Sequence, residues 1–301
     1  MIESGIRHFG AICVLSALPL FACAGGGGEG GSIDRKVAAD PKGEVVISNV
    51  SGMVDVRGWD RNEVHVTGDL DEDVERVDVD SIAGRTYVKV VIPSGGSHDS
   101  DATLEVRVPM MSTVEVTVVS ADVASRGVLG TQRLKSVSGE ITADMSGDNS
   151  EVRSVSGDIT VRGNGKPMSL RASSVSGSVD VTNVAGKLDV VTVSGTARAQ
   201  MGEAGEVRAR TTSGDIEIRG QLTPDARVDV EAVSGDVRLN LTGQGISTEI
   251  ESFSGDIDGC LAGKVEHSKY GPGKRLTIRT VESGPRVRAK TLSGDIEICN
   301  K

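Results

Sequence analysis

Residues 136–142 read SVSGEIT and residues 154–160 read SVSGDIT, and this short sequence motif recurs along the second half of the chain. Related phrases follow as SVSGSVD, TVSGTAR, TTSGDIE, AVSGDVR, SFSGDID and TLSGDIE. Their glycines are Gly139, Gly157, Gly177, Gly195, Gly214, Gly235, Gly255 and Gly294, with steps of 18, 20, 18, 19, 21, 20 and then 39 residues. A repeat with a period near 20 residues is typical of a solenoid, in which stacked units share one core.

Within each unit apolar and polar residues alternate, and Val and Ile are frequent, as in RVDVEAVSGDVRLNL (227–241). This period of two predicts strands, and no helical periodicity follows the first 22 residues. We therefore expect an all-β, single-stranded β-solenoid with rungs of about 20 residues. Two columns should point inward: the residue before each Ser-Gly, such as Val137, and the residue two after each Gly, such as Ile141.

Residues 44–128 are rich in strands but lie outside the regular period, as in EVVISNVSGMVDVRGW (44–59). We interpret this part as an antiparallel start that caps the first rung of the solenoid. The expected organisation is a signal peptide at 1–22, a lipidated Cys and Gly-rich tether at 23–43, the β-rich cap at 44–128 and the repeat solenoid at 129–301.

The SVSGDI units, the stretch from Val46 to Asp60 and the turn at Val108-Pro109 resemble one family over roughly residues 44–300. It is the bacterial putative-adhesin domain of unknown function, found as a β-solenoid on exported proteins. The resemblance implies an envelope location and an adhesin-like role. The family has no established catalytic residues, so none is implied here.

The first residues predict the cellular address. An apolar run from Ala11 to Ala22 is long enough for a signal peptide and too short to cross a bilayer. It ends in Leu20-Phe21-Ala22-Cys23, which resembles the lipobox of bacterial lipoproteins and makes Cys23 the expected lipidation site. Ordinary secretion with cleavage near Ala22 is the alternative. The Gly-rich AGGGGEGGS (24–32) that follows has the composition of a flexible tether.

Composition excludes several kinds of partner. The net charge is −10, so no nucleic-acid partner is expected, because such proteins carry a basic patch. Only six of 301 residues are aromatic, which leaves little for stacking sugars or bases. Neither H-x-x-x-H nor C-x-x-C spacing occurs, and we expect no metal site, no cofactor and no enzymatic activity.

An acidic residue follows the repeat glycine in six of eight units. These are Glu140, Asp158, Asp215, Asp236, Asp256 and Asp295. Stacked at the spacing of rungs, such carboxylates repel one another unless something compensates. They either accept backbone N–H groups in the turns, which we favour, or bind a cation such as Ca²⁺ between rungs.

Cys260 and Cys299 occupy the same repeat position, five residues after the glycine. If residues 261–293 form a single rung with a long loop, the two residues are close enough for a disulfide, which we expect in an exported protein. Two intervening rungs would place them too far apart. The chain ends two residues later, so the last rung should expose an edge that can pair with another molecule.

We therefore expect a non-enzymatic, lipid-anchored β-solenoid of the cell envelope, on the outer membrane or cell surface. It would present an adhesin-like surface to a protein or glycan ligand. A periplasmic scaffold or sensor domain that acts through protein contacts is the first alternative. A polysaccharide-active β-helix enzyme is the second.

Overall fold

The computed structural model describes residues 31–93, 100–260, 263–267, 272–279 and 284–300. All regular secondary structure in these ranges is β-strand, which confirms the all-β prediction. No helix in the described part of the chain is long and apolar enough to cross a membrane.

The strands form two ladders, A and B, within which neighbours run parallel. Ladder A contains, in spatial order, β6 (Arg85–Val91), β2 (Glu44–Asn49), β8 (Thr113–Val118), β10 (Gln132–Ser136), β12 (Ser150–Ser154), β14 (Pro167–Ser176), the later parts of β15 (Val179–Ser194), β16 (Ala197–Ser213) and β17 (Ile216–Ser234), then β23 (Arg286–Ser293) and β19 (Ser247–Ser254). Ladder B contains β7 (Asp101–Pro109), β3 (Ser51–Trp59), β9 (Asp122–Arg126), β11 (Ile141–Met145), β13 (Ile159–Gly163), the earlier parts of β15 to β17, then β18 (Val237–Thr242), β24 (Ile296–Asn300) and β20 (Ile257–Gly259).

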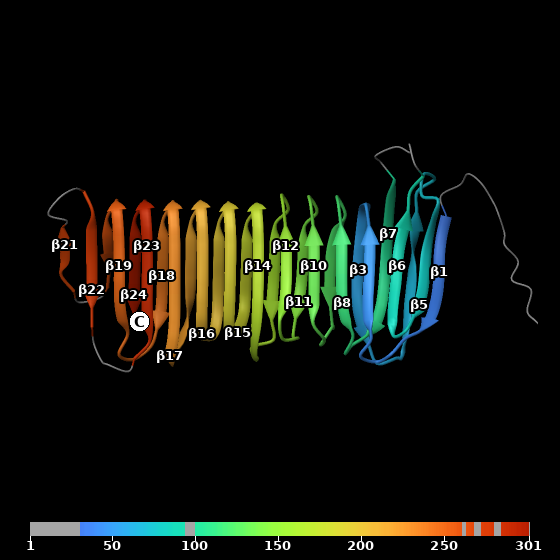
Figure 1. Ribbon diagram of the computed structural model, residues 1–301, viewed down its shortest axis with the longest axis horizontal. Coiled ribbons are helices and arrows are strands. Elements are labelled where there is room, and N and C mark those ends of the chain that lie inside the picture. The colour runs from blue at the N-terminus through green and yellow to red at the C-terminus, as the bar shows by residue number, and fades with distance from the viewer. Residues whose placement is uncertain (1–30, 94–99, 261–262, 268–271, 280–283, 301) are drawn as a thin grey trace, which may run out of the picture.

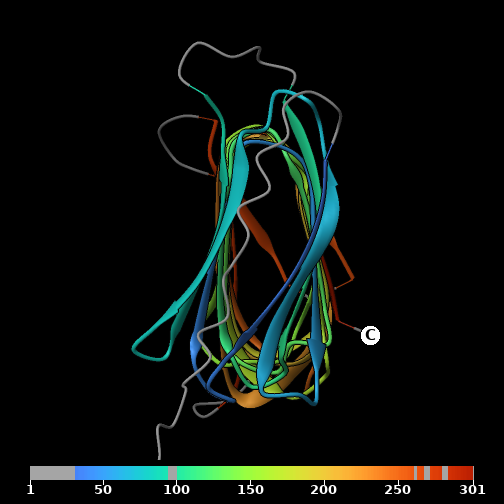
Figure 2. The ribbon, with the colours of Figure 1, turned by 90° about the vertical axis from the view of Figure 1, so that its right-hand side faces the viewer.

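One strand of ladder A, a Ser-Gly turn and one strand of ladder B make one rung. Seen from the side, the rungs stand next to each other along the long axis (Figure 1). Seen from one end, they form a flattened ring whose two long sides are the ladders (Figure 2). The architecture is β-solenoid-like.

Two rungs are out of chain order. Near the C-terminus, β23 pairs with both β17 and β19, and β24 pairs with both β18 and β20. The last rung of the chain therefore lies between the two rungs that precede it in the sequence. Near the N-terminus, β2 and β3 likewise lie between the rung of β6 and β7 and the rung of β8 and β9.

Antiparallel strands cover the two ends of the stack. At the N-terminal end, β5 (Arg76–Ile82) pairs with β6, β4 (Glu63–Leu70) pairs with β7, and β1 (Gly31–Ala38) pairs with β4. At the other end, β22 (Lys274–Ile278) pairs with β19, and β21 (Val265–His267) pairs with β22. Short antiparallel end strands limit edge-to-edge pairing with other sheets.

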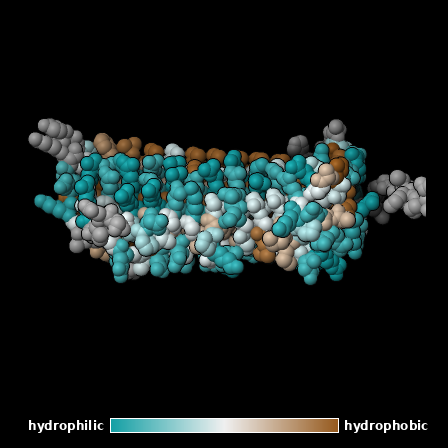
Figure 3. Space-filling view, turned by 60° about the horizontal axis from the view of Figure 1, so that its bottom comes forward, coloured by the Kyte–Doolittle hydropathy of each residue, from teal (hydrophilic) through white to brown (hydrophobic). Residues whose placement is uncertain are grey.

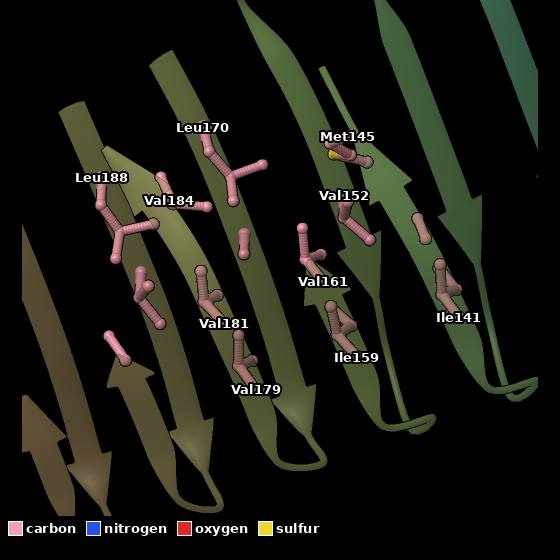
Figure 4. Packing of buried hydrophobic residues seen from close by; sticks show 14 of the residues in the cluster. Ile141, Met145, Val152, Ile159, Val161, Leu170, Val179, Val181, Val184 and Leu188 are labelled. Carbon is pink, nitrogen blue, oxygen red and sulfur yellow. The ribbon is translucent and has the colours of Figure 1, made fainter. Parts of the chain in front are cut away.

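The core is the narrow space between the ladders, filled almost entirely by aliphatic side chains. Figure 4 shows Ile141, Ile159 and Val179 of ladder B in successive rungs, with Leu170 and Leu188 of ladder A. The column two residues after each repeat glycine is buried in all eight units, as predicted. Branched aliphatic side chains suit such stacked, pleated surfaces, which is why the fold needs few aromatics.

The other predicted inward column is wrong, because the residue before each Ser-Gly points outward. Val137 is 44% exposed and Phe253 is 56% exposed. The inward position belongs to the residue one place earlier, such as Ser136 and Ser154, which are buried. The last inward position before the turn is therefore one residue earlier in the sequence than we predicted.

Three expectations about the ends also need correction. The tether predicted for residues 23–43 ends earlier, because Gly31–Ala38 is already the strand β1. The antiparallel start expected for residues 44–128 is wrong in part, because β2 and β3 pair in parallel with both of their neighbours and only β4 and β5 add antiparallel pairs. The C-terminal rung offers no open edge, because β24 is paired on both sides.

Candidate binding surface at the turn edge

The Ser-Gly turns all lie along one long edge of the molecule, and several of them are held from inside by buried hydroxyl groups. Ser136 Oγ accepts the N–H of Gly139, and Ser154 Oγ accepts that of Gly157, both at 2.8 Å. Near the C-terminus, Ser252 Oγ instead donates to the Gly294 carbonyl at 3.1 Å. A hydroxyl inside the turn supplies a partner for backbone groups that leave the ladder there, which explains why Ser and Thr occupy this inward position.

Because those serines occupy the inward position, the next residue in each turn projects into solvent. These side chains form an apolar ridge, which we define in spatial order as Val50, Val119, Val137, Val155, Val175, Val193, Thr212, Val233, Leu292 and Phe253. Ten rungs at a spacing of about 4.8 Å give the ridge a length of about 43 Å. In Figure 3 hydrophobic side chains form a row along one long edge, above a largely hydrophilic face.

The acidic column lies on the other side of the same turns. Asp215 Oδ1 accepts the N–H of Asp236 at 3.0 Å, and Asp236 Oδ1 accepts the N–H of Asp295 at 3.0 Å. Asp295 Oδ1 accepts the N–H of Asp256 at 2.7 Å, and Asp158 Oδ1 accepts that of Ser178 at 2.7 Å. Each of these carboxylates therefore binds the backbone of the neighbouring rung, which offsets the repulsion along the column.

Two further features of this column bear on the alternative of a cation bound between the rungs. The Lys274 ammonium hydrogen-bonds to the exposed Asp256 carboxylate and lowers its pKa. Among the described residues, no group of three or more His, Cys, Asp or Glu side chains is arranged to hold a metal ion. The geometry of the column favours backbone capping over a cation site.

The outward face of ladder A carries charges that alternate in sign over long runs of neighbouring rungs, although Lys135 lies opposite Arg153. One column reads Glu115, Arg133, Glu151, Arg171, Asp189, Arg208, Asp229, Arg288 and Glu249. Arg171 contacts Asp189 at 2.9 Å, and Arg288 lies 3.7 Å from Glu249. Opposite charges on neighbouring strands stabilise a sheet modestly, and like charges destabilise it.

A second column on this face reads Arg210, Glu231, Lys290, Glu251 and Arg275. Lys290 and Arg275 both form ion pairs with Glu251, and they lower the pKa of its carboxyl group. Both columns alternate only because the last rung is inserted. In strict chain order Asp229 would face Glu249, and Glu231 would face Glu251.

Cys260 and Cys299 form a disulfide whose Cα atoms are 4.7 Å apart. The bridge ties the inserted last rung to its neighbour at the far end of ladder B. The expected site of lipidation, Cys23, lies outside the described residues.

Three features of the surface were not predicted from the sequence. The predicted alternation placed the ridge residues inward and the hydroxyl residues outward, which is the reverse of the structure. The recurrence of Ser or Thr two places before the repeat Ser was the signal that could have revealed this. Asp122, whose Oδ1 accepts the N–H of Glu140 at 2.9 Å, begins the acidic column one rung earlier. Its turn reads Ser120-Ala121-Asp122, so the missing glycine concealed it.

Comparison with known proteins gives a family and several distant structural likenesses. The chain is similar to a putative cell adhesion protein from Clostridium sporogenes, with 11% identity, a TM-score of 0.28 and coverage of 91% of this chain and 100% of the other. A putative adhesin from Parabacteroides distasonis has 13% identity and a TM-score of 0.35, with coverage of 90% and 98%. A putative lipid binding protein from the same species has 11% identity and a TM-score of 0.35, with coverage of 89% and 96%.

No curated protein matches. Residues 84–299 match the family described as Toastrack DUF4097, and this range spans most of the chain. The protein therefore belongs to the Toastrack DUF4097 family.

Proposed function

We propose that this protein is a non-enzymatic, lipid-anchored component of the bacterial cell envelope that binds another protein along the apolar ridge. The body is taken as a single-stranded β-solenoid, in which one chain supplies every rung. The adhesin names of the structural relatives agree with a binding role.

The ridge is the observation that carries the proposal. It places an apolar side chain at nine of ten successive rungs, each close to half exposed, in a straight line. Contiguous apolar surface of this kind on a soluble body marks a site of interaction. A ridge one side chain wide suits a partner that also presents a row of apolar groups at the spacing of strands.

Charge defines the partner further. The acidic column follows the ridge at a distance of three residues along the chain, as Asp236 follows Val233. If the ridge of a second copy packed against this ridge, the acidic column of that copy would lie against apolar or acidic side chains. We therefore favour a partner whose apolar row is accompanied by Lys or Arg.

The binding experiment uses defined peptides. We expect an extended peptide of alternating Val and Lys to bind, and one of alternating Val and Glu not to bind. Replacing Val155, Val175 and Val193 together by Ser should weaken binding at least tenfold. The matched control replaces Ile82, Met111 and Leu129 together by Ser. These residues are also exposed but lie off the ridge, so the affinity should stay unchanged. Equal losses in the two triple variants would contradict the proposal.

The anchor needs a separate experiment in intact cells. A palmitate analogue should label the wild type and not Cys23→Ala, and the variant should be released from the membrane. Only residues 24–30 separate Cys23 from β1, so the anchored body would lie within about 25 Å of the bilayer. Removal by external protease would support the cell surface. Labelling with protection from protease would favour the periplasmic scaffold or sensor.

A polysaccharide-active enzyme is the remaining alternative. It predicts breakdown of a glycan by the purified protein. Turnover of an acidic glycan that stops when Asp229 or Glu249 is replaced would overturn the non-enzymatic assignment.

A further inference from the structure

Two places on ladder A break the alternation of charge: Lys135 lies opposite Arg153, and Arg227 lies opposite Arg286. Arg227 of β17 lies directly opposite Arg286 of β23, whereas on its other side it faces Glu206 of β16. Two like charges in register destabilise a sheet, and arginine cannot relieve this by losing its proton. The pair exists only because the last rung is inserted beside β17.

The two side chains share an open groove of about 860 Å³ with three more arginines. Its charged lining consists of Arg227, Arg275, Arg279, Arg286, Arg288, Asp229 and Glu249. Five cations against two anions give the groove a charge of +3 in a chain whose net charge is −10. Such a local excess of one sign concentrates ligands of the opposite sign.

Most of that excess is uncompensated by the protein. Arg275 is paired with Glu251, and Arg288 lies 3.7 Å from Glu249. Arg227, Arg279 and Arg286 have no carboxylate of the described residues within 4.0 Å. Arg227 also attracts the Glu206 carboxylate on the neighbouring strand, without a close ion pair. Guanidinium groups bind carboxylate, sulfate and phosphate oxygens through paired hydrogen bonds, so these three side chains keep donors that can hold oxyanions.

The two carboxylates narrow the class of ligand. Asp229 and Glu249 only accept hydrogen bonds, so they would repel a ligand made solely of phosphates but would accept sugar hydroxyl groups. The groove has no aromatic side chain on which a nucleobase could stack, and it has no deep apolar pocket for a peptide anchor. Its open form across β17, β23, β19 and β22 suits a chain rather than a compact molecule.

We propose that this groove binds an acidic polysaccharide, with the anionic groups of the sugar on Arg227 and Arg286 and its hydroxyl groups on Asp229 and Glu249. The site is separate from the ridge and depends on neither the lipid anchor nor the protein partner. It gives this protein a second binding function, toward glycans.

The test uses the soluble protein without its first 22 residues and with Cys23 replaced by Ser. Polygalacturonate is the probe, and its fully methyl-esterified form is the matched ligand without charge. The variant is Arg227→Gln with Arg286→Gln. The control is Arg133→Gln with Arg162→Gln, which removes the same charge at two arginines outside the groove.

We expect the wild type to bind polygalacturonate, with affinity that falls between about 50 and 200 mM salt, and to bind the methyl ester at least tenfold more weakly. The groove variant should lose at least tenfold in affinity and most of the salt dependence, whereas the control should stay within twofold. The melting temperature of the groove variant should change little, because the substitutions remove the repulsion between Arg227 and Arg286 together with the attraction of Arg227 to Glu206. A loss of affinity at an unchanged melting temperature therefore shows that binding, and not folding, has been lost.

Several outcomes would overturn the proposal. Absence of binding by the wild type would do so, as would equal losses in the two double variants, which indicate general attraction by surface charge. Tighter binding of inorganic polyphosphate, single-stranded DNA or phosphatidylglycerol vesicles than of polygalacturonate would assign the groove to phosphate ligands instead. None of these results bears on the peptide experiment at the ridge, so the two proposals fail separately.

Discussion

The backbone N–H of Asp295 donates to the carboxylate of Asp236 at 3.0 Å across a sequence separation of 59 residues. In a solenoid wound strictly in chain order, the partner of Asp236 would be Asp256, in the next repeat. Asp256 instead donates its N–H to Asp295 at 2.7 Å. The final rung is thus held on both sides by the same kind of bond that joins Asp215 to Asp236 and Asp158 to Ser178.

The N-terminal end repeats this arrangement with different residues. Asn49 in β2 donates to the carbonyl of Ala102 in β7 at 3.0 Å, and β3 pairs with both β7 and β9. At each end, therefore, a rung from the end of the folded chain lies one position inside the stack. Fraying of a terminal segment would have to open a ladder that is paired on both sides, which is costly compared with opening an edge.

Removing the last rung tests the inserted order. A chain that stops at Pro285 retains all of residues 247–259, but those residues lose β23 and β24, their parallel partners. We expect amide hydrogens of β19 and β20 to lose protection from exchange, while β11 and β13 stay protected. Adding a peptide of residues 286–300 should restore protection. A stack in chain order would instead keep β19 protected on β17.

The disulfide should stabilise the same region. Cys260 and Cys299 are 39 residues apart, so loop closure predicts a contribution of at most about 4 kcal/mol to the free energy of unfolding. Replacing both by Ser should lower stability by about 2–4 kcal/mol and increase exchange chiefly in β19, β20, β23 and β24. A reducing agent should reproduce the effect in the wild type and do nothing to the variant. Uniform loss of protection along the whole stack would contradict a local clasp.

The repeat predicted the fold class and the inward Ile column because both depend only on local alternation and period. Ile141 and Ile159 are buried in whatever order the rungs stack. The sequence also favoured one rung rather than two between Cys260 and Cys299, and this placed the cysteines in reach of each other. The structure brings the two cysteines together through the inserted rung, because β24, which carries Cys299, pairs with β20, which Cys260 directly follows.

The ridge and the order of the rungs could not be predicted in the same way. Whether Val137 or Ser136 points inward depends on where the strand ends at the turn, and a turn that needs an internal hydroxyl overrides hydrophobicity. The order of rungs depends on contacts between distant columns, such as Lys290 with Glu251. Those contacts can be recognised only when the residues of the two outward columns are written in their spatial order, because that order differs from their order in the sequence.

Most positions of the glycine column should tolerate no side chain, although Ala121 occupies the column near its N-terminal end. Gly235 has a φ of +139°, and a Cβ there would lie 2.1 Å from the Gly214 carbonyl oxygen. We expect Gly235→Ala to lower the free energy of unfolding by at least about 2 kcal/mol, measured by urea denaturation. Gly202→Ala is the control, because the nearest atom to its Cβ would be 3.9 Å away. Similar costs at both positions would argue against close stacking of the turns.

The acidic column distinguishes backbone capping from calcium binding. Asp236→Asn keeps an oxygen that can accept the N–H of Asp295 and should cost less than about 0.5 kcal/mol, whereas Asp236→Ala leaves that N–H without its partner and should cost about 1–2 kcal/mol. Asp258→Ala, on the outward face of ladder B, is the control for loss of a carboxylate. Calcium should leave the melting temperature unchanged. A calcium-dependent rise that Asp236→Asn abolishes would instead establish a cation site.

Stability of the C-terminal end should depend on pH through Glu251. Its carboxylate contacts Lys290 of the inserted rung and Arg275 of the terminal hairpin, and Lys290 is the larger cause of its lowered pKa. A carboxyl group whose pKa is lower in the folded state than its ordinary value of 4.5 stabilises the fold above that value. The contribution disappears as the pH falls through the lower folded-state pKa.

We therefore expect Glu251→Gln to lose about 1 kcal/mol at pH 7 relative to the wild type, and the difference to shrink as the pH falls below 4.5. Denaturation of both proteins across this range measures it. Glu297→Gln removes a carboxylate that has no ion pair among the described contacts and serves as the control. Because Lys290 reaches Glu251 only from an inserted rung, a difference that does not change with pH would count against the pair and against the order of rungs that creates it.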